Sequence, residues 1–345
     1  MLRPRSLLIS SVLLLLLAGG CQQAKTPDTL RLSGQTMGTT WSVIMVRGAE
    51  SVDSEGLQKR LQASLDQINR LMSTYDPESQ LSRFNTRFST DWFPISEETA
   101  QVIEVAQEVS RLSDGAFDVS IGPLVELWGF GPTPRGEKIP TEEQINKKLA
   151  LVGYENIRLR RNPPAVRKEV AGLQIDLSAV AKGYAVDALA EIIEQQGINN
   201  YLLEIGGELQ ISGHRGDGTP WQIAIEKPLE GVREVAAIIP LTDTALATSG
   251  NYRNFYVEGG QRYSHTIDPV RGQPTRHKLA AVTVLDQTCA RADALATALM
   301  ALGEEKGREL CEKHQIAAYF IIHERTSTTV YASPAFERFL QEVKQ

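Results

Sequence analysis

The sequence predicts an α+β fold in which helices pack around strand-rich sheets, and three observations lead to this prediction. First, residues 54–72 and 97–112 carry apolar side chains at helical spacing. Second, residues 201–252 contain short apolar segments separated by glycine-bearing turns, which is typical of strands. Third, the chain contains neither GxGxxG nor GxxxxGKS/T, so a Rossmann or P-loop nucleotide fold with a regular βαβ array is not supported.

The N-terminus has the features of a signal peptide. Arg3 and Arg5 precede an apolar stretch at 7–17, and small residues stand directly before Cys21. Residues 1–20 therefore resemble a bacterial lipoprotein signal, cut so that the Cys21 thiol becomes the lipidated first residue, although Ala18 stands where such signals more often carry Leu. The alternative is a plain secretory signal with an incidental cysteine. Residues 21–29 are predicted to be a polar tether and 30–345 the functional domain, outside the cytoplasm.

Composition narrows the remaining possibilities. With 345 residues and 42% hydrophobic content, the chain can form one large core or two medium ones. A formal net charge of −6 provides no general basic surface, so nucleic acid is not expected as a partner. Behind the signal, Cys289 and Cys311 could pair in an oxidising compartment or remain two buried thiols, and their spacing does not resemble a metal site.

The first elements of the domain follow from alternation and periodicity. Residues 30–46 alternate like a strand or hairpin, interrupted around Gly38, which indicates a bulge or a close backbone approach. Residues 54–72 form an amphipathic helix whose apolar side chains belong to the core. Residues 97–112 form a second one, with Ser96 as its N-cap.

Two irregular segments flank the second helix. Tyr75 precedes the turn signal Asp76-Pro77, where its ring can lie flat over a ligand or pack against the protein. Residues 115–131 combine glycines, a proline and aromatic side chains, which indicates a shaped segment of the kind that contacts ligands. A short helix over 141–152 follows.

Residues 172–187, GLQIDLSAVAKGYAVD, are the strongest local candidate for a ligand site. Alternation over 173–177 predicts a strand, and a turn of small residues leads into a helix that runs to Gln196. Such a turn lets a backbone approach a ligand, and Lys182 and Asp187 bring opposite charges to it. The alternative is an ordinary strand, a Ser-capped helix and a surface lysine.

Two further pairs could carry chemistry. His265 and Asp268 stand three residues apart, so that a carboxylate could orient an imidazole as a proton acceptor. Their alternative is a structural turn capped by Asp268. Asp293 and Thr297 stand four apart on a helix, share a face, and offer the hard oxygen atoms that suit Mg²⁺. Their alternative is a solvated carboxylate and a hydroxyl bonded to the preceding turn.

In combination these segments resemble the ApbE family, the FAD:protein FMN transferases. The resemblance covers about residues 32–332 and rests on ordered motifs behind the signal. The motifs are MGTTW, STYDPESQLSRFN, GAFDVSIGPLVELWGFG, IDLSAVAKGYAVD, EIGGELQISG, TSGNYRNF, YSHTIDPVRG and ADALATALMALG. The resemblance implies a fold with FAD in a cleft between subregions. It also implies a Mg²⁺-dependent reaction that moves FMN from FAD to a Thr, sometimes Ser, hydroxyl of a protein and releases AMP.

The resemblance also implies roles for individual residues. His265 and Asp268 would be the catalytic pair. Mg²⁺ would be held by Asp293, Thr297, the carbonyl of Ala179 and, as a further carbonyl, that of Ala296. The side chains expected to line FAD are Met37, Tyr75, Ala116, Phe117, Asp118, Asp176, Lys182 and Ile267.

Partners and location follow from the same resemblance. Expected acceptors are subunits of membrane redox complexes such as the sodium-pumping NADH:quinone reductase (Nqr) and its Rnf relatives. The domain would be held by its lipid on the periplasmic side of the envelope, at the inner membrane in preference to the outer one. Two rival functions remain, a Mg²⁺-dependent FAD pyrophosphatase that yields FMN and AMP and a non-catalytic FAD-binding lipoprotein.

Overall fold

The computed structural model describes residues 29–46, 52–133, 139–229, 234–252, 254–324 and 327–341. The predicted signal peptide, the lipidation site Cys21 and the tether as far as residue 28 lie outside the described residues. None of the helices in the described ranges combines the length and the apolar character needed to span a bilayer.

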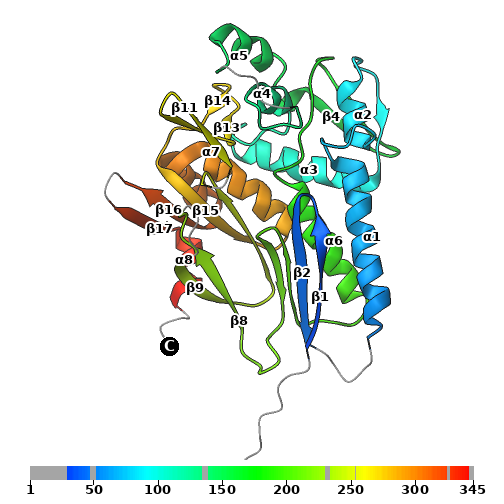
Figure 1. Ribbon diagram of the computed structural model, residues 1–345, viewed down its shortest axis with the longest axis vertical. Helices are drawn as coiled ribbons and strands as arrows, with labels where there is room; N and C mark the ends of the chain where they lie inside the picture. The colour runs from blue at the N-terminus through cyan, green and yellow to red at the C-terminus, as the bar shows by residue number, and fades with distance from the viewer. Residues whose placement is uncertain are drawn as a thin grey trace, which may run out of the picture.

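A large antiparallel sheet forms the centre of the molecule (Figure 1). Within the described residues it has eight strands in the order β1-β2-β6-β7-β10-β15-β16-β17, so some neighbours are hairpins, such as β1 and β2, while others, such as β2 and β6, come from distant parts of the chain. The strands are β1 (Thr29–Thr36), β2 (Thr39–Val46), β6 (Tyr201–Ile205), β7 (Glu208–Ser212), β10 (Thr244–Gly250), β15 (Leu279–Asp286), β16 (Ala317–His323) and β17 (Thr328–Ala332).

Smaller sheets surround this centre. One places β5 (Pro164–Lys168) between β3 (Phe93–Pro94) and β4 (Ile157–Arg161), and a two-stranded ribbon pairs β8 (Trp221–Glu226) with β9 (Val235–Leu241). Two short pairs complete the described strands, β11 (Phe255–Glu258) with β12 (Gln261–Ser264) and β13 (Ile267–Asp268) with β14 (Gln273–Pro274).

Helices cover one face of the large sheet, and the β8–β9 ribbon with α8 covers the other. Alternation along the strands explains the two layers: in β10, Ala245 and Ala247 face the helices, whereas Leu246 faces the ribbon. The helices are α1 (Ser54–Met72), α2 (Gln80–Thr86), α3 (Glu97–Leu112), α4 (Gly122–Leu127), α5 (Glu142–Leu149), the 3₁₀ helix η1 (Tyr154–Asn156), α6 (Ala181–Glu194), α7 (Cys289–His314) and α8 (Pro334–Gln341). The predicted α+β class is confirmed.

Both long amphipathic helices are confirmed at their predicted ends. Asp53 caps α1 and Ser96 caps α3, each through a side-chain oxygen that accepts from a backbone N–H in the first turn. The hairpin reading of residues 30–46 is also confirmed. Of the two alternatives at Gly38, the bulge is wrong, because Met37 and Gly38 both have positive φ and form a two-residue turn that matches the twist of β1 and β2. A close backbone approach is not seen within the described residues either, since a Cβ at Gly38 would meet no atom within 4 Å.

The predicted strand at 173–177 is wrong. Alternate side chains there are buried as expected, but the backbone makes only one isolated bridge, between Gln174 and Ile121. A side chain takes the place of a neighbouring strand, because Asn85 binds both backbone groups of Ile175, the N–H at 2.8 Å and the carbonyl oxygen at 2.7 Å. Extended backbone satisfied in this way cannot be distinguished from a strand by periodicity.

Other details of the prediction change at helix ends. α5 stops at Leu149 instead of running to residue 152, and α6 stops at Glu194 instead of Gln196. α6 begins after Val180 without a side-chain cap, so the Ser-capped alternative is also wrong. Cys289 and Cys311 are both buried and free, so of the two alternatives the structure has the pair of buried thiols.

Candidate active site

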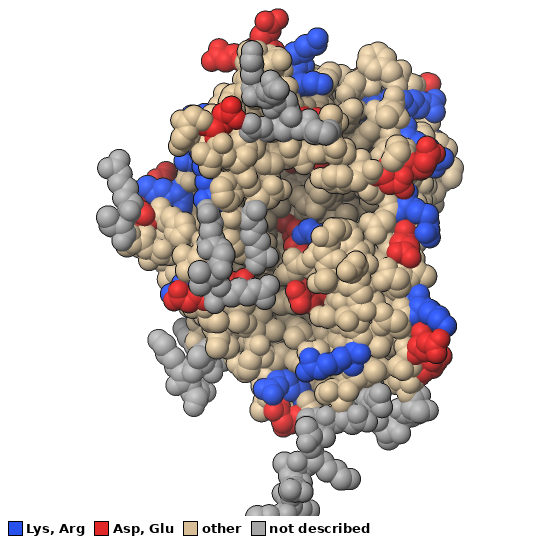
Figure 2. All heavy atoms as spheres, viewed as in Figure 1, with Lys and Arg blue, Asp and Glu red and all other residues tan. Residues whose placement is uncertain are grey.

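One cavity of about 840 Å³ collects most of the side chains that the sequence singles out. This volume lies within the range of about 300–1,000 Å³ that is usual for ligand pockets. Figure 2 shows one face of the molecule hollowed near its centre, with acidic and basic atoms inside the hollow. The predicted site residues that line the cavity are Tyr75, Ala116, Phe117, Asp118, Asp176, Ala179, Lys182, His265, Ile267, Asp293 and Thr297.

Three predicted site residues lie elsewhere. Met37 is in the β1–β2 turn and packs against the main core, and Ala296 is fully buried inside α7. Asp268 lines a second cavity of about 930 Å³, which shares part of its wall with the first. The cavity wall therefore includes most of the residues predicted to bind the metal and the flavin. Of the predicted catalytic pair it includes only His265.

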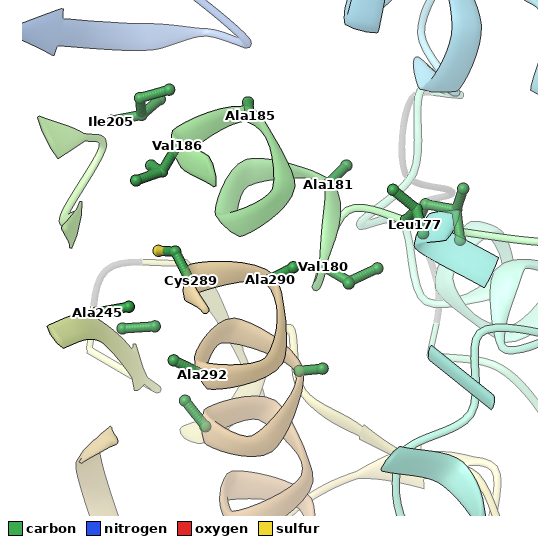
Figure 3. Close-up of a cluster of buried hydrophobic side chains, with 14 of the residues drawn as sticks. Leu177, Val180, Ala181, Ala185, Val186, Ile205, Ala245, Cys289, Ala290 and Ala292 are labelled. Atoms are coloured by element: carbon green, nitrogen blue, oxygen red, sulfur yellow. The ribbon is translucent and has the colours of Figure 1, made fainter. Parts of the chain in front are cut away.

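The N-terminal ends of α6 and α7 cross in close contact beside the cavity, with small side chains between them (Figure 3). Gly183 packs so tightly that a Cβ there would lie 2.3 Å from the carbonyl oxygen of Cys289. One turn later, Asp187 accepts hydrogen bonds from the backbone N–H groups of Cys289 at 2.8 Å and Ala290 at 2.9 Å. Asp187 thus caps α7 from another helix. The spacing of Lys182 and Asp187 had suggested that both belong to one ligand site, and Asp187 does not.

Asp187 makes a pH-dependent contribution to stability. Burial, the largest cause, raises the pKa of this carboxyl from 3.8 to about 6 against the opposing effect of its two backbone hydrogen bonds. The folded chain therefore binds this proton more tightly than the unfolded chain, and the contribution to the free energy of unfolding increases as the pH falls from about 6 to about 4.

An Asp187→Asn variant tests this contribution, because it keeps an oxygen for the cap but does not titrate. When the pH is lowered from 7 to 4, the free energy of unfolding of the wild type should rise relative to that of the variant by at most about 3 kcal/mol. Urea denaturation of both proteins at the two pH values measures it. A difference that stays constant with pH would contradict the assignment.

Lys182, Glu208 and Asp293 form the charged centre of the cavity. The Nζ of Lys182 donates to Oε1 of Glu208, and both carboxylates are buried. Burial disfavours the ammonium, but the charges of Asp293 and Glu208 outweigh it and raise the pKa of Lys182. Burial raises the pKa of both carboxyls, which share this one ammonium. A further cation at this centre would relieve the repulsion between the two carboxylates.

Glu208 is a site residue that the sequence analysis missed. It lies in the motif EIGGELQISG, but its charge alone does not distinguish it from a surface glutamate. The turn between β6 and β7 uses Gly206 and Gly207, both with positive φ, and it brings Glu208, the first residue of β7, into the cavity wall. A carboxylate directly after a Gly-Gly turn on a predicted central strand is the signal that could have identified it.

The oxygen atoms of this centre fit Mg²⁺. Oε2 of Glu208 is buried and, among the described residues, has no hydrogen-bond partner. Asp293 uses Oδ2 to accept from the backbone N–H of Gly183 at 3.1 Å, and Thr297 lines the same cavity one turn further along α7. The described residues contain no group of three His, Cys, Asp or Glu side chains placed to hold a metal. Mg²⁺ does not need one, because one or two carboxylates and substrate phosphates commonly complete its shell.

His265 is oriented by a backbone carbonyl. Its Nδ1 lies 3.1 Å from the carbonyl oxygen of Asn254, which can only accept, so Nδ1 carries the proton and Nε2 is the free acceptor of the neutral ring. Burial lowers the pKa of His265, the hydrogen bond to Asn254 opposes this, and the charge of Lys182 lowers it further. The imidazole is therefore neutral at pH 7 and able to take a proton.

Asp268 does not orient this imidazole. Its Oδ1 accepts from the backbone N–H groups of Val270 at 2.8 Å and Arg271 at 3.1 Å, and the Arg271 guanidinium lies 3.7 Å from Oδ2. These are the contacts of the structural turn that the sequence analysis held as the alternative. The sequence predicted that Asp268 orients the His265 imidazole. In the structure the backbone carbonyl of Asn254 orients it instead.

Two further predicted flavin contacts also organise the loops around the cavity. The carboxylate of Asp118 accepts from Ser120 and from the backbone N–H of Tyr154, which ties residues 118–120 to the start of η1. Asp176 accepts from the backbone N–H of Ser178 at 2.9 Å and so shapes the turn that leads to Lys182. Their contacts with FAD stay predictions.

This fold and site define a class of α+β protein suited to group transfer at phosphate, with a lysine between two buried carboxylates and a neutral imidazole in one ligand-sized cavity. The model of the ApbE family matches residues 37–320. The chain belongs to the ApbE family.

Individual relatives agree with this membership over nearly the whole length of the chain. The FAD:protein FMN transferase of Vibrio cholerae serotype O1 is 43% identical over 338 residues, which cover 98% of this chain and 100% of that protein. The FAD:protein FMN transferase of Escherichia coli K12 is 38% identical over 333 residues, which cover 94% of this chain and 95% of that protein.

Solved structures show the same fold. The flavin transferase ApbE from Vibrio cholerae superposes with a TM-score of 0.84 at 42% identity, covering 91% of this chain and 99% of that one. The apo form of Pseudomonas stutzeri flavinyl transferase ApbE gives a TM-score of 0.83 at 40% identity, covering 91% of this chain and 97% of that one. The α+β fold expected from the resemblance is confirmed.

Proposed function

We propose that this chain transfers FMN from FAD to a hydroxyl of an acceptor protein and releases AMP. Membership of a family whose relatives are named FAD:protein FMN transferases supports flavin transfer to a protein. The structural observation that carries the proposal is the placement of Lys182 between Glu208 and Asp293 in a cavity of about 840 Å³. A diphosphate ester is the part of FAD that this charged centre would hold.

The proposed step is an in-line displacement at the FMN phosphorus. The acceptor oxygen forms a new P–O bond, the bond to the AMP phosphate breaks, and AMP leaves with the electron pair. Nε2 of His265 takes the proton of the acceptor hydroxyl, because it is the unprotonated nitrogen of a ring fixed by Asn254. Lys182 stabilises the negative charge that develops on the phosphate oxygens.

Mg²⁺ would be held at the same centre by Asp293, Thr297 and Glu208, with the carbonyl of Ala179 in the adjoining wall. When bound it would neutralise charge on the diphosphate. The carbonyl of Ala296, a residue buried in α7 next to Thr297, stays a predicted further donor, and the Glu208 carboxylate is added to the set. Tyr75 has 69% of its surface exposed at the cavity rim, where its ring is free to lie over the flavin.

The acceptor residue and the cellular location belong to the same proposal. We propose a Thr, or sometimes Ser, as acceptor, in subunits such as those of Nqr and Rnf complexes. A lipid on Cys21 would hold the enzyme at the periplasmic side of the inner membrane, where such subunits can reach it. The motif at residues 18–21 and the polar segment that follows it support the anchor.

Incubation with FAD, Mg²⁺ and the flavin-carrying domain of an Nqr subunit tests this function. We expect a flavin-labelled band that survives denaturation, with FMN on one Thr by mass spectrometry and one AMP released per flavin attached. FMN and AMP formed at the same rate without acceptor would favour the pyrophosphatase instead. Intact FAD after incubation with Mg²⁺ and acceptor would leave only a binding protein.

A further inference from the structure

The strand β8 lines the cavity in an unusual way. Five consecutive residues, 222–226, all contribute to the cavity wall. Successive side chains of a strand point to opposite faces, so one face of β8 could supply only every second residue. An uninterrupted run means that the edge of the strand, with its backbone N–H and C=O groups, borders the cavity.

No strand of the described part of the chain pairs with this edge of β8. Within the described residues β8 pairs only with β9, and the two form a separate two-stranded ribbon. In their register Gln222 lies opposite Pro240 and Ala224 opposite Ile238. Proline has no N–H and is placed where a strand does not need one, which makes the Gln222–Pro240 pair a non-hydrogen-bonded one. The backbone groups of Gln222 and Ala224 are then directed away from β9, towards the cavity.

The ribbon is held firmly on its inner face and is apolar on its outer face. Trp221, Ile223 and Ile225 are buried against the large sheet. On the outer side Ala224 is exposed, and opposite it Ile238 leaves 50% of its surface uncovered. The edge is therefore held firmly, and the outer face of the ribbon that it borders is apolar, with only the small Ala224 side chain between the edge and Ile238.

We propose that the free edge of β8 binds an extended segment of the acceptor protein as an added strand, and that Ile238 contacts an apolar side chain of this segment. The inference rests on the proposed function, which requires a polypeptide hydroxyl to reach the cavity. The edge borders the same cavity as Lys182 and His265, so a strand bound there leads directly to the reacting phosphate. Strand addition supplies affinity through the backbone, and the contacted side chains supply selectivity.

The chemistry of the edge favours a polypeptide over the other possible occupants. Alternating N–H and C=O groups along several residues match another extended backbone, whereas a dinucleotide has no row of amides at strand spacing. The acceptor segment is therefore expected to be extended around its Thr or Ser, to lack proline at the pairing positions, and to carry an apolar residue two or more positions from the hydroxyl.

Hydrogen exchange of the β8 amides tests the proposal without any change to this chain. The probe is an Nqr acceptor domain of a kind that the wild-type chain flavinylates, with its acceptor Thr replaced by Val so that it docks without reacting. Spectra are compared for the enzyme alone, with FAD and Mg²⁺, and with FAD, Mg²⁺ and the probe. We expect the amides of Gln222 and Ala224 to exchange at least tenfold more slowly only in the third sample.

The other results would overturn the proposal. Slow exchange with FAD and Mg²⁺ alone would assign the edge to flavin binding. Slow exchange that grows with enzyme concentration in the absence of probe would assign it to a second copy of this chain. Unchanged exchange while the probe is bound would place the acceptor on another surface.

An Ile238→Lys variant gives an independent kinetic test at a residue outside the cavity wall. We expect the KM for the acceptor to rise about three- to tenfold, with the affinity for FAD unchanged. The matched control is Val257→Lys, at a valine of comparable exposure (59%) on β11, which should leave all constants unchanged. Equal KM values for wild type and Ile238→Lys would refute docking at this ribbon. If the wild type binds FAD but labels no acceptor, the proposed function fails instead, and the two failures remain distinguishable.

Discussion

An Asp293→Asn enzyme is expected to fold and bind FAD but to transfer flavin about 10²- to 10³-fold more slowly, and to respond little to Mg²⁺. Asn has nearly the same shape and can still accept from the backbone N–H of Gly183, so the crossing of α6 and α7 should persist. The substitution removes one of the two carboxylates whose charges act on Lys182. Transfer rates measured across a Mg²⁺ titration give the result.

The matched control for this experiment is Glu312→Gln, a carboxylate to amide change at an exposed position of the same helix. It should keep the wild-type rate and the wild-type Mg²⁺ dependence. An Asp293→Asn enzyme with an unaltered Mg²⁺ response would show that the metal, if needed, is held by other groups.

A His265→Asn enzyme is expected to lose about 10²- to 10⁴-fold in transfer rate, the usual contribution of a general base. In the wild type only the neutral ring accepts a proton, and its pKa is below the ordinary 6.5 because of burial. The rate should therefore be flat around neutral pH and fall on the acid side of that value. The variant should lose this acid limb as well as the rate.

Single-turnover rates from pH 5 to pH 8 measure both effects, and His214→Asn, at an exposed histidine, is the control. If the slow His265→Asn enzyme kept the full acid limb, the titrating group would be another residue, with Glu208 the first to examine because burial raises the pKa of its carboxyl. FAD affinity should be similar in all three proteins, which separates a lost base from a lost binding site.

The periodicity of apolar residues correctly predicted the helices and strands that bury one face and expose the other. α1 and α3 end where their apolar repeats end, and the β1–β2 hairpin follows its alternation. The same reasoning failed for residues 173–177, because the side chain of Asn85, far away in the sequence, supplies the partner that a strand would have. The local sequence predicts which side chains are buried, but it does not predict which distant residue forms hydrogen bonds with the backbone.

In the site, too, the sequence identified some residues and missed others. Spacing predicted that Asp293 and Thr297 share one face of a helix, since helical geometry puts residues four apart together, whereas their role at Mg²⁺ came from the resemblance to the ApbE family and stays a prediction. Glu208 was missed because its role depends on burial and on contact with Lys182 from another element. The use of Asp187 was not predictable, because it caps a helix about a hundred residues away. The turn that Asp268 closes is local, and the sequence offered it as one of two alternatives.

The order of strands in the large sheet also has a consequence for how the chain folds. β2 pairs with β6, so one edge of β2 stays unpaired until the chain as far as residue 205 has folded beside it. A hairpin such as β1–β2 closes within microseconds, and α1, which follows it directly and contacts β1, can cover its apolar face while the outer edge of β2 stays open. The folding chain therefore depends on being kept apart from its own copies until β6 closes this edge.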